Sequence, residues 1–380
     1  MIQSSLLFFS LITFSYAASS TLPIVGRHNY DVAISTASLT DTGRLDPFAN
    51  NGSSRRVMIT SFLPVASCRR KDLQKYMLPA TAAFEDEKFG AYGLPNGSFH
   101  ALELETCASK FPSPRQQGKE ESFPLVIFSG ALGTSRLLYS SMLQSIAAAG
   151  YLVISLDHPY DADVVEFSDG TLIKGVDISD DDLEAALATR VEDIVYVHRQ
   201  LSNQSVANVL VPGYRDGCKK ALLRTAVVGH SFGGAAAAAA MLSLPSIRGG
   251  VNLDGTMFGS VLSAGLSRPF LLMGHENKTQ ETDPSWKATW PNLKGWKREL
   301  EVKDAAHYSF SDLPLITETL GLQGQLPQEV GQLLGNIEGN RMMNLTVSYL
   351  TSFLDFVLKK KSRGVLFHSM DFPEVVLNAH

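Results

Sequence analysis

The chain has 380 residues, of which 44% are hydrophobic and 19% charged, and its formal net charge is −5 at pH 7. This is an ordinary globular composition with ample apolar material for a core. The length alone would allow two domains, but large α/β domains often run this long as one. The mild acidity, without an extended basic block, excludes the clustered positive field that nucleic-acid binding requires. The run Lys359–Lys361 ends an apolar helical pattern, where lysines complement the helix C-terminus.

The first residues contain an apolar stretch, Leu6 to Phe14, followed by the small residues Ser15 and Ala17. This stretch is too short to span a bilayer but is typical of a signal-peptide core, with cleavage after about Ala17 or Ala18. A buried N-terminal strand or helix is the alternative. No later segment has the uninterrupted apolar length of a membrane helix. We therefore expect a secreted protein with a signal peptide at 1–18 and one domain at 19–380.

Asparagine sequons and cysteines fit an extracellular chain. Three cysteines in an oxidising compartment predict one disulfide and one leftover thiol. Cys68 and Cys107 lie in segments that both read as strands or strand ends, so we favour that pair and leave Cys218 free. The sequence has no C-x-x-C, His/Cys cluster or H-E-x-x-H, so we expect no metal site. The predicted glycosylation sites are Asn51, Asn96, Asn203, Asn277 and Asn344.

Apolar, β-branched stretches bounded by turn residues alternate with helical patterns along the chain. The predicted strands are Val57–Val65, His100–Cys107, Phe123–Ser129, Tyr151–Asp157, Thr225–Gly229, Gly250–Asp254, Pro269–Met273 and Glu299–Val302. The predicted helices are Leu138–Ala149, Asp181–Leu201, Gly233–Leu244 and a last long one that includes Met343, Val347, Leu350, Leu354 and Val357. The stretch 321–327 is expected to join the last two helices. This alternation predicts an α/β fold with a largely parallel sheet and helices on both faces.

One turn between a strand and a helix carries a recognisable nucleophile motif. The run from Thr225 passes through Gly229-His-Ser231-Phe-Gly233 into an alanine-rich helix. G-x-S-x-G in this context is a nucleophile elbow, in which the serine occupies a strained turn and the glycines let strand and helix approach closely. A tight turn whose serine only caps the helix is the alternative. We predict that Ser231 is a nucleophile.

A serine nucleophile needs a base, which in this fold follows the nucleophile and the acid in the chain. His307 lies in a loop beyond the strand-like Glu299–Val302, and His275, also at a strand end, competes with it. His368 and His380 lie beyond the final helix. We favour His307, because its order fits the last-strand position of the base.

The base in turn needs a carboxylate that orients it. Asp254 ends the strand that follows the nucleophile helix and is the favoured acid. Asp283 and Glu276, one strand later, compete with it, and a buried aspartate that caps a turn is a further reading of Asp254.

An acyl transfer also needs two backbone N–H groups for the oxyanion. One should come from Phe232, directly after the nucleophile, and the other from the loop Gly130–Gly133 after an early strand, with Leu132 as the expected donor. An ordinary glycine turn is the alternative reading of that loop.

Several of these segments match one family of motifs. Residues 229–234 read GHSFGG, with Leu253-Asp254 at the same distance downstream, and residues 307–312 fit H-x-x-F-x-D. Residues 128–133 and 138–140, FSGALG and LYS, are similar to an F-S-H-G-L-G loop followed by L-Y-S, and 44–49 and 55–64 look like entry strands. Over roughly residues 40–360 the chain thus resembles the platelet-activating factor acetylhydrolase family, the lipoprotein-associated and type II intracellular enzymes.

The resemblance implies an α/β-hydrolase fold, Ser231, Asp254 and His307 as the triad, and Leu132 and Phe232 as oxyanion donors. It also implies hydrolysis of short or oxidised sn-2 acyl esters of phospholipids without a metal or organic cofactor, in a secreted fungal relative. Gly130-Ala131 replaces the His-Gly pair of many members, and residues 155–180 and 275–298, which would shape the acyl pocket, match little.

Two other functions remain to be distinguished from this one. A general secreted carboxylesterase or lipase, or a cutinase-like polyester hydrolase, would use the same residues. A catalytically dead hydrolase fold used for binding would have lost a triad member, and none is lost here. No protein partner is implied. Buried core is the favoured reading of the tryptophans, and an apolar pocket or lipid-facing rim is the alternative for Trp286, Trp290 and Trp296.

Overall fold

The computed structural model describes residues 19–108, 122–213, 219–362, 364–366 and 370–378. The predicted signal peptide at 1–18, Cys218, His368 and His380 lie outside the described residues. Among the described helices, none is long and apolar enough to cross a membrane.

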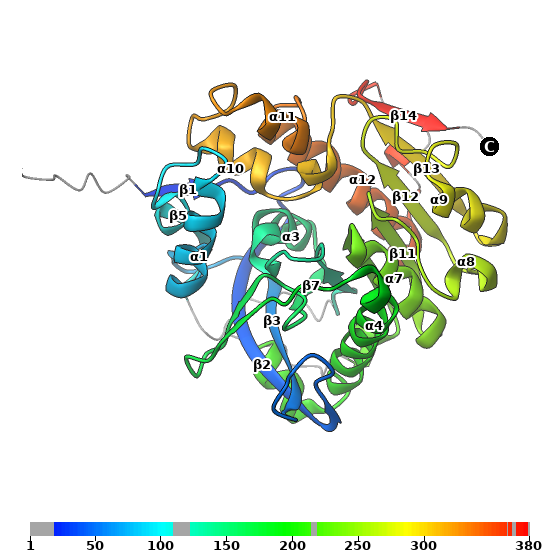
Figure 1. The fold of residues 1–380 in the computed structure, drawn as a ribbon, viewed down its shortest axis with the longest axis horizontal. Helices are drawn as coiled ribbons and strands as arrows, with labels where there is room; N and C mark the ends of the chain where they lie inside the picture. The colour runs from blue at the N-terminus through cyan, green and yellow to red at the C-terminus, as the bar shows by residue number, and fades with distance from the viewer. Residues whose placement is uncertain (1–18, 109–121, 214–218, 363, 367–369, 379–380) are drawn as a thin grey trace, which may run out of the picture.

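A central sheet organises the described part of the chain, with nine strands in the order β14-β13-β12-β11-β10-β6-β7-β3-β2 (Figure 1). The pairs from β7 through β6, β10, β11 and β12 to β13 are parallel, while β3 joins β7 and β2 antiparallel and β14 closes the other edge antiparallel. The strands are β2 Asp31–Leu45, β3 Ser54–Val65, β6 Leu125–Ser129, β7 Leu152–Asp157, β10 Thr225–His230, β11 Ile247–Leu253, β12 Phe270–Gly274, β13 Lys297–Val302 and β14 Val375–Asn378. The parallel strands therefore present their carboxyl ends at one edge, where the loops of an α/β site gather.

Alternate side chains of the inner strands enter two separate cores, so both faces of the sheet are buried. In β6, Val126 and Phe128 join one core, whereas Leu125 and Ile127 join the other. The first core is covered by α3 Ser140–Ala148, α10 Leu313–Thr319 and α12 Gly339–Lys359. The second is covered by α4 Leu183–Gln200, α5 Gln204–Leu210, α7 Phe232–Ser243, α8 Val261–Ala264 and α9 Pro284–Thr289. This arrangement confirms the predicted α/β architecture.

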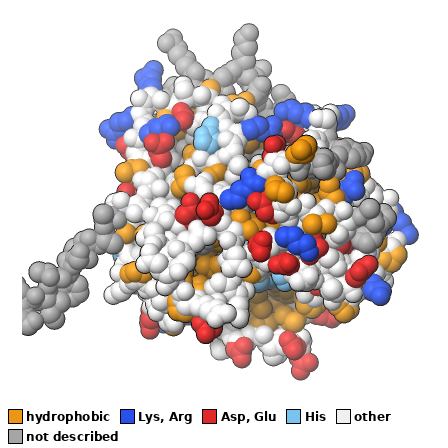
Figure 2. All heavy atoms as spheres, turned by 90° about the horizontal axis from the view of Figure 1, so that it is seen from above, with side chains coloured by type: hydrophobic (Ala, Val, Ile, Leu, Met, Phe, Trp, Pro, Cys, Tyr) orange, Lys and Arg blue, Asp and Glu red, His pale blue; other side chains and the backbone are white. Residues whose placement is uncertain are grey.

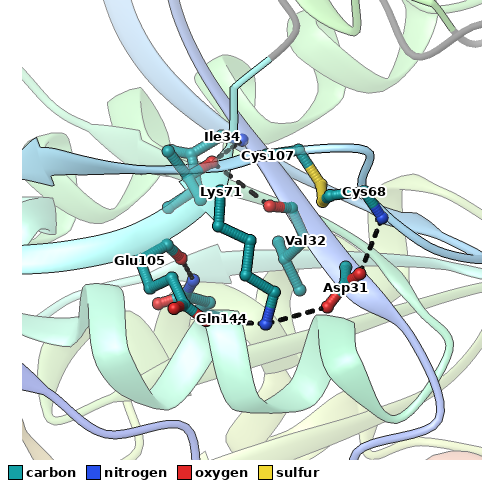
Figure 3. Close-up of a disulfide and its surroundings, with 9 residues drawn as sticks. Asp31, Val32, Ile34, Cys68, Lys71, Glu105, Cys107 and Gln144 are labelled. Carbon is teal, nitrogen blue, oxygen red and sulfur yellow. Dashed lines mark hydrogen bonds and ion pairs between the residues drawn. A yellow bond between two sulfur atoms is a disulfide. The ribbon is translucent and has the colours of Figure 1, made fainter.

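A smaller sheet lies beside the first core, in the order β1-β5-β4 (Figure 1). It contains β1 Ser20–Leu22, β4 Lys71–Lys75 and β5 Leu102–Cys107, with α1 Pro79–Gly90 and α2 Ser98–Ala101 between them. The predicted disulfide Cys68–Cys107 links the segment before β4 to the end of β5 (Figure 3). Both cysteines pack against the second core, and polar contacts lie beside them: Cys68 N donates to Asp31 Oδ2 at 2.7 Å, and Lys71 pairs with Asp31 and Glu105. The cross-link thus fastens the small sheet near the start of β2.

The remaining elements are short. They are the hairpin β8 Val164–Glu166 and β9 Leu172–Lys174, the helices α6 Lys219–Leu222 and α11 Gln328–Leu334, and the single-turn 3₁₀ helices Arg136–Tyr139, Asp180–Asp182, Trp290–Asn292, His307–Phe310 and Gly364–Leu366.

The sequence-based prediction of elements was wrong in four places. The long strand β2 was missed, because its alternation of small and polar residues lies on an edge that buries little. The entry strand expected at 44–49 is only the end of β2 followed by a turn. The strand expected over His100–Cys107 begins only at Leu102, because His100 and Ala101 belong to α2. The stretch 321–327 joins α10 to α11, a short helix that the apolar pattern did not reveal, and not the last two helices.

Candidate active site

Ser231 lies in a strained turn between β10 and α7. Its backbone has φ 55° and ψ −124°, a conformation that costs a non-glycine residue roughly 1–3 kcal/mol. Neighbouring glycines permit this turn: a Cβ on Gly229 would lie 2.0 Å from Gly233 O, and one on Gly233 would lie 2.0 Å from Ser129 O. Ser231 N donates to Leu253 O at 2.8 Å, which anchors the turn to β11. The local sequence therefore produces the elbow geometry that it predicts.

Three side chains from separate loops form a continuous hydrogen-bonded row. His307 Nε2 lies 3.0 Å from Ser231 Oγ, and His307 Nδ1 lies 2.5 Å from Asp254 Oδ2. The Asp254 side chain is fully buried, whereas 36% of the His307 side chain is exposed. Such a row can take the proton of an attacking serine and stabilise the imidazolium that forms.

Asp254 is held by both of its oxygens. Oδ1 accepts hydrogen bonds from His275 N at 2.9 Å and from His275 Nδ1 at 2.6 Å, and Oδ2 contacts His307. Burial alone would raise the pKa of Asp254, but the hydrogen bonds from His275 and His307 outweigh it and hold the pKa below its ordinary value. The carboxylate therefore stays ionised at neutral pH.

The competing candidates have other partners. His275 contacts the acid on the oxygen that His307 does not use. Asp283 caps α9 through Ser285 N and Trp286 N, and Glu276 accepts a hydrogen bond from Asp304 N. Of the candidates that the sequence left open, His307 and Asp254 are the two that form a hydrogen-bonded row with Ser231.

Asp254, His275 and His307 are also the described residues that come closest to a metal-ligand set, with one donor atom each within 4.8 Å of the others. Tetrahedral zinc would hold such atoms roughly 3.3 Å apart. The N···O separations of 2.5 and 2.6 Å are those of hydrogen bonds and leave no room for an ion between the partners. The three residues therefore fit a hydrogen-bonded set better than a metal site.

The two backbone N–H groups predicted to bind the oxyanion have no acceptor among the described residues. Phe232 is the first residue of α7, so its N–H is one of the helix's unpaired donors. In the loop after β6, Ala131 N donates to Tyr139 Oη at 3.0 Å and Gly133 N to Asp161 O at 3.0 Å, while Leu132 N makes no backbone hydrogen bond to another described residue. Leu132 and Phe232 thus have the free amides expected of oxyanion donors.

His230 ties this loop to the base, a link that the sequence did not reveal. Its Nε2 donates to His307 O at 2.9 Å, so its Nδ1 accepts from the Tyr139 hydroxyl at 2.9 Å. Burial, with the nearby charge of His307, lowers the pKa of His230 to about 3. The ring is therefore neutral, as this pattern of donors and acceptors requires.

A buried polar cluster lies beneath the loop. Ser129 Oγ and His158 Nε2 are 2.9 Å apart, and His158 Nδ1 lies 2.9 Å from Asp193 Oδ2. The guanidinium of Arg190 on α4 donates a hydrogen bond to Ser129 Oγ. A sequence signal for it existed, because Arg190 and Asp193 share the helical phase of the buried Leu187 and Ile194.

A small apolar cavity of about 70 Å³ is lined by residues that neighbour the site in the chain, while Ser231, Asp254 and His307 are not among its lining residues. Tyr308, which directly follows the base and packs its ring edge-on against His307 at 5.4 Å, forms part of its wall, as does Thr134 at the end of the oxyanion loop. The other lining residues are Lys88, Phe89, Tyr92, Leu94, Leu138, Leu313, Thr317, Val330, Leu333 and Leu334. None of them falls in the regions 155–180 and 275–298 that were expected to shape an acyl pocket.

The tryptophans of the second region are mostly core. Trp286 is completely buried and donates from Nε1 to Gly255 O at 2.7 Å, directly after the acid. Trp290 and Trp296 are half-buried and pack against the two cores. The favoured core reading fits all three.

The five sequons differ in exposure. Asn51, Asn96, Asn203 and Asn277 are exposed, whereas Asn344 is half-buried within α12. The Asn203 side chain caps α5. Acidic and basic side chains are interspersed over the face drawn in Figure 2, without a patch of one sign.

Comparison with known proteins places this geometry in a family. Residues 102–167 and 203–365 match the model of "Platelet-activating factor acetylhydrolase, isoform II". The chain is 31% identical, over 89% of each sequence, to a "Probable 1-alkyl-2-acetylglycerophosphocholine esterase" of Arthroderma benhamiae. It is 26% identical to the platelet-activating factor acetylhydrolase of Cavia porcellus over 60% of this chain and 58% of that one.

The fold has solved counterparts as well. A ferulic acid esterase from Streptomyces cinnamoneus superimposes with a TM-score of 0.79 at 27% identity, covering 95% of this chain and 99% of that one. Family model, relatives and fold agree: the chain belongs to the platelet-activating factor acetylhydrolase isoform II family, ester hydrolases of the α/β-hydrolase fold.

Proposed function

We propose that this protein hydrolyses short or oxidised sn-2 acyl esters of phospholipids through an acyl-enzyme on Ser231. The observation that carries the proposal is the row Ser231–His307–Asp254, whose contacts of 3.0 and 2.5 Å are those of a serine hydrolase triad.

In the first half-reaction, Ser231 Oγ attacks the ester carbonyl while His307 Nε2 takes the hydroxyl proton. Asp254 holds the ring through Nδ1 and stabilises the imidazolium that forms. The N–H groups of Leu132 and Phe232 bind the developing oxyanion. His307 then protonates the departing glycerol oxygen, which leaves Ser231 acylated.

In the second half-reaction, water attacks the acyl-enzyme, with His307 as base. About a third of the His307 side chain is exposed, so water can approach the ring from solvent. Water addition, collapse of the oxyanion and return of the proton to Ser231 release the carboxylic acid. Every step uses side chains and amides of this chain.

Two features support a short acyl group. The relative from Arthroderma benhamiae is named for an acetyl ester of a glycerophosphocholine. The cavity bounded by Tyr308 and Thr134 is apolar and, at about 70 Å³, has room for roughly five water-sized groups. A short chain fits this volume, whereas a long fatty acyl chain exceeds it.

Substrate profiling tests the proposal. Purified protein should release acetate from 1-alkyl-2-acetylglycerophosphocholine faster than fatty acids from long-chain phosphatidylcholine, triglyceride or polyester film. Faster turnover of triglyceride or polyester would instead identify a lipase or cutinase-like enzyme.

Ser231→Ala tests the nucleophile. It should abolish p-nitrophenyl acetate turnover and fluorophosphonate labelling while the circular dichroism spectrum is unchanged. Undiminished turnover would refute the assignment of Ser231, and failure of the natural protein to label would indicate a catalytically dead binding protein.

We further propose that the protein acts outside the cell, with residues 1–18 removed as a signal peptide. The disulfide Cys68–Cys107 supports this, because disulfides persist in oxidising compartments. Mass spectrometry of protein secreted by its host should find an N-terminus at about residue 18 or 19 and glycans at exposed sequons; retention of the first 18 residues would contradict it.

A further inference from the structure

Arg190 is the buried residue whose contacts converge on the oxyanion loop. It lies on α4, its side chain is 2% exposed, and all five of its N–H donors are used. Two of them bind the Asp161 carboxylate, which balances the charge. The other three bind Ser129 Oγ at 3.0 Å, Gly130 O at 2.5 Å and Ala131 O at 3.1 Å.

The bond to Ala131 O fixes the direction of the next amide. In a trans peptide the C=O and N–H groups point in opposite directions. With Ala131 O turned toward Arg190, Leu132 N–H must point away from the guanidinium. The preceding peptide is held at both ends, since Gly130 O binds Arg190 and Ala131 N binds Tyr139 Oη.

Arg190 also contacts the residue that supplies the other amide. Its guanidinium carbon lies 5.0 Å from the ring centroid of Phe232, within cation–π range. Asp161 is the carboxylate partner of Arg190. Its backbone oxygen also accepts a hydrogen bond from Gly133 N, at the far end of the loop. The buried Arg190–Asp161 ion pair thus contacts both sources of the predicted oxyanion donors: the loop that carries Leu132 and the ring of Phe232.

From these contacts we propose that Arg190 is a positioning residue that preorganises the oxyanion hole. The inference rests on the proposed function, because it presumes that Ser231 generates an oxyanion at Leu132 and Phe232. Preorganised donors cost no reorganisation when charge develops, so loosening them should slow the chemical step and leave substrate binding largely intact.

Arg55 provides a matched control. It is as buried as Arg190 and pairs with Asp193 and Asp46, and its other hydrogen bond goes to Pro159 O. Among the described residues it makes no direct bond to the loop and reaches Ser129 only through Asp193 and His158. A purely structural role for Arg190 predicts that Arg190→Lys and Arg55→Lys behave alike.

The test measures kcat and KM for p-nitrophenyl acetate, the inhibition constant of an alkylboronic acid that forms a tetrahedral adduct with the serine, and the melting temperature. Lysine cannot bind three separate acceptors in the plane of a guanidinium. Arg190→Lys should therefore lower kcat about 10- to 100-fold, with KM changed less than about threefold, and should weaken the boronic acid by a similar factor. Arg55→Lys should lower the melting temperature but change kcat less than about threefold.

If Arg190→Lys does not fold, the double variant Arg190→Met/Asp161→Asn removes both buried charges and should show the same loss of kcat and boronic acid affinity. If either folded variant keeps its kcat and its affinity for the boronic acid while its melting temperature falls, the inference is overturned. That outcome differs from failure of the proposed function, which would appear as activity remaining in Ser231→Ala.

Discussion

His275 Nδ1 lies 2.6 Å from Asp254 Oδ1, so the carboxylate that orients His307 also carries a second imidazole. The two histidines follow neighbouring strands, β12 and β13, whose carboxyl ends meet at the acid. His275 acts on the base only through Asp254, and its backbone N–H binds the same oxygen at 2.9 Å.

Replacing His275 should have a modest effect on catalysis. In His275→Ala the backbone bond to Oδ1 remains and water can replace the ring, so kcat should fall about three- to tenfold. Steady-state kinetics with p-nitrophenyl acetate measure this. His100→Ala is the control, because His100 also binds a carboxylate, Asp86 Oδ2 at 2.6 Å, and lies in α2. A thousandfold loss would instead make His275 part of the proton relay.

His230 should contribute a loss of stability on acidification below about pH 6.5, because its ring is buried and neutral in the folded state. Its pKa is lowered from 6.5 to about 3 in the folded state. Between these values the unfolded chain binds a proton that the native chain does not, so the free energy of unfolding falls by up to about 1.4 kcal/mol per pH unit as pH decreases. Above pH 6.5 this contribution is constant.

Urea unfolding at pH 4 to 7 tests that dependence. Asparagine does not titrate in this range. His230→Asn should therefore reduce the slope of the free energy of unfolding against pH by the equivalent of about one proton. Other buried groups contribute to the slope of both proteins: His158, whose pKa burial lowers, adds to it, and Asp312, whose pKa burial raises to about 7, opposes it. An unchanged slope in His230→Asn would show that His230 is protonated in the native state.

The disulfide should contribute substantially to stability. Its cysteines are 39 residues apart, and closing a loop of that size restricts the unfolded chain by an amount worth about 2–4 kcal/mol. Cys68→Ala/Cys107→Ala should therefore lower the free energy of unfolding by that amount, measured with urea at pH 7. Because β4 and β5 lie away from Ser231 in the fold, kcat at 25 °C should stay within about twofold; a large loss of kcat would contradict this separation.

The cavity beside Tyr308 should limit the acyl chain. Leu334 is a half-buried lining residue, and Leu334→Ala should enlarge the cavity and shift the preferred p-nitrophenyl ester from acetate toward butyrate or hexanoate. Ratios of kcat/KM along the ester series measure the shift. Leu320→Ala, the same truncation at a half-buried residue outside the lining, should leave the ratios unchanged. Equal ratios in both variants would place the acyl group elsewhere.

The sequence by itself determined the elbow and its order in the chain. Gly229, Ser231 and Gly233 are neighbours, and their close approach needs only the strand-turn-helix in which they lie, so local residues specify it. The strong strands were predictable for the same reason, since their buried residues are consecutive. β2 was not, because an edge strand buries too little to leave an apolar pattern.

Only the tertiary structure decided between partners that lie far apart in the chain. His275 and His307 both follow strands, and it is the register of β12 and β13 beside β11 that brings His307 to Ser231 and leaves His275 on Asp254. Likewise, the sequence shows Arg190 only as one polar residue on an amphipathic helix. Its contacts with residues 129–131 become visible only in the packed structure. Periodicity reports which face is buried, but hydrogen bonds between buried polar groups depend on distances and angles that only the packed chain sets.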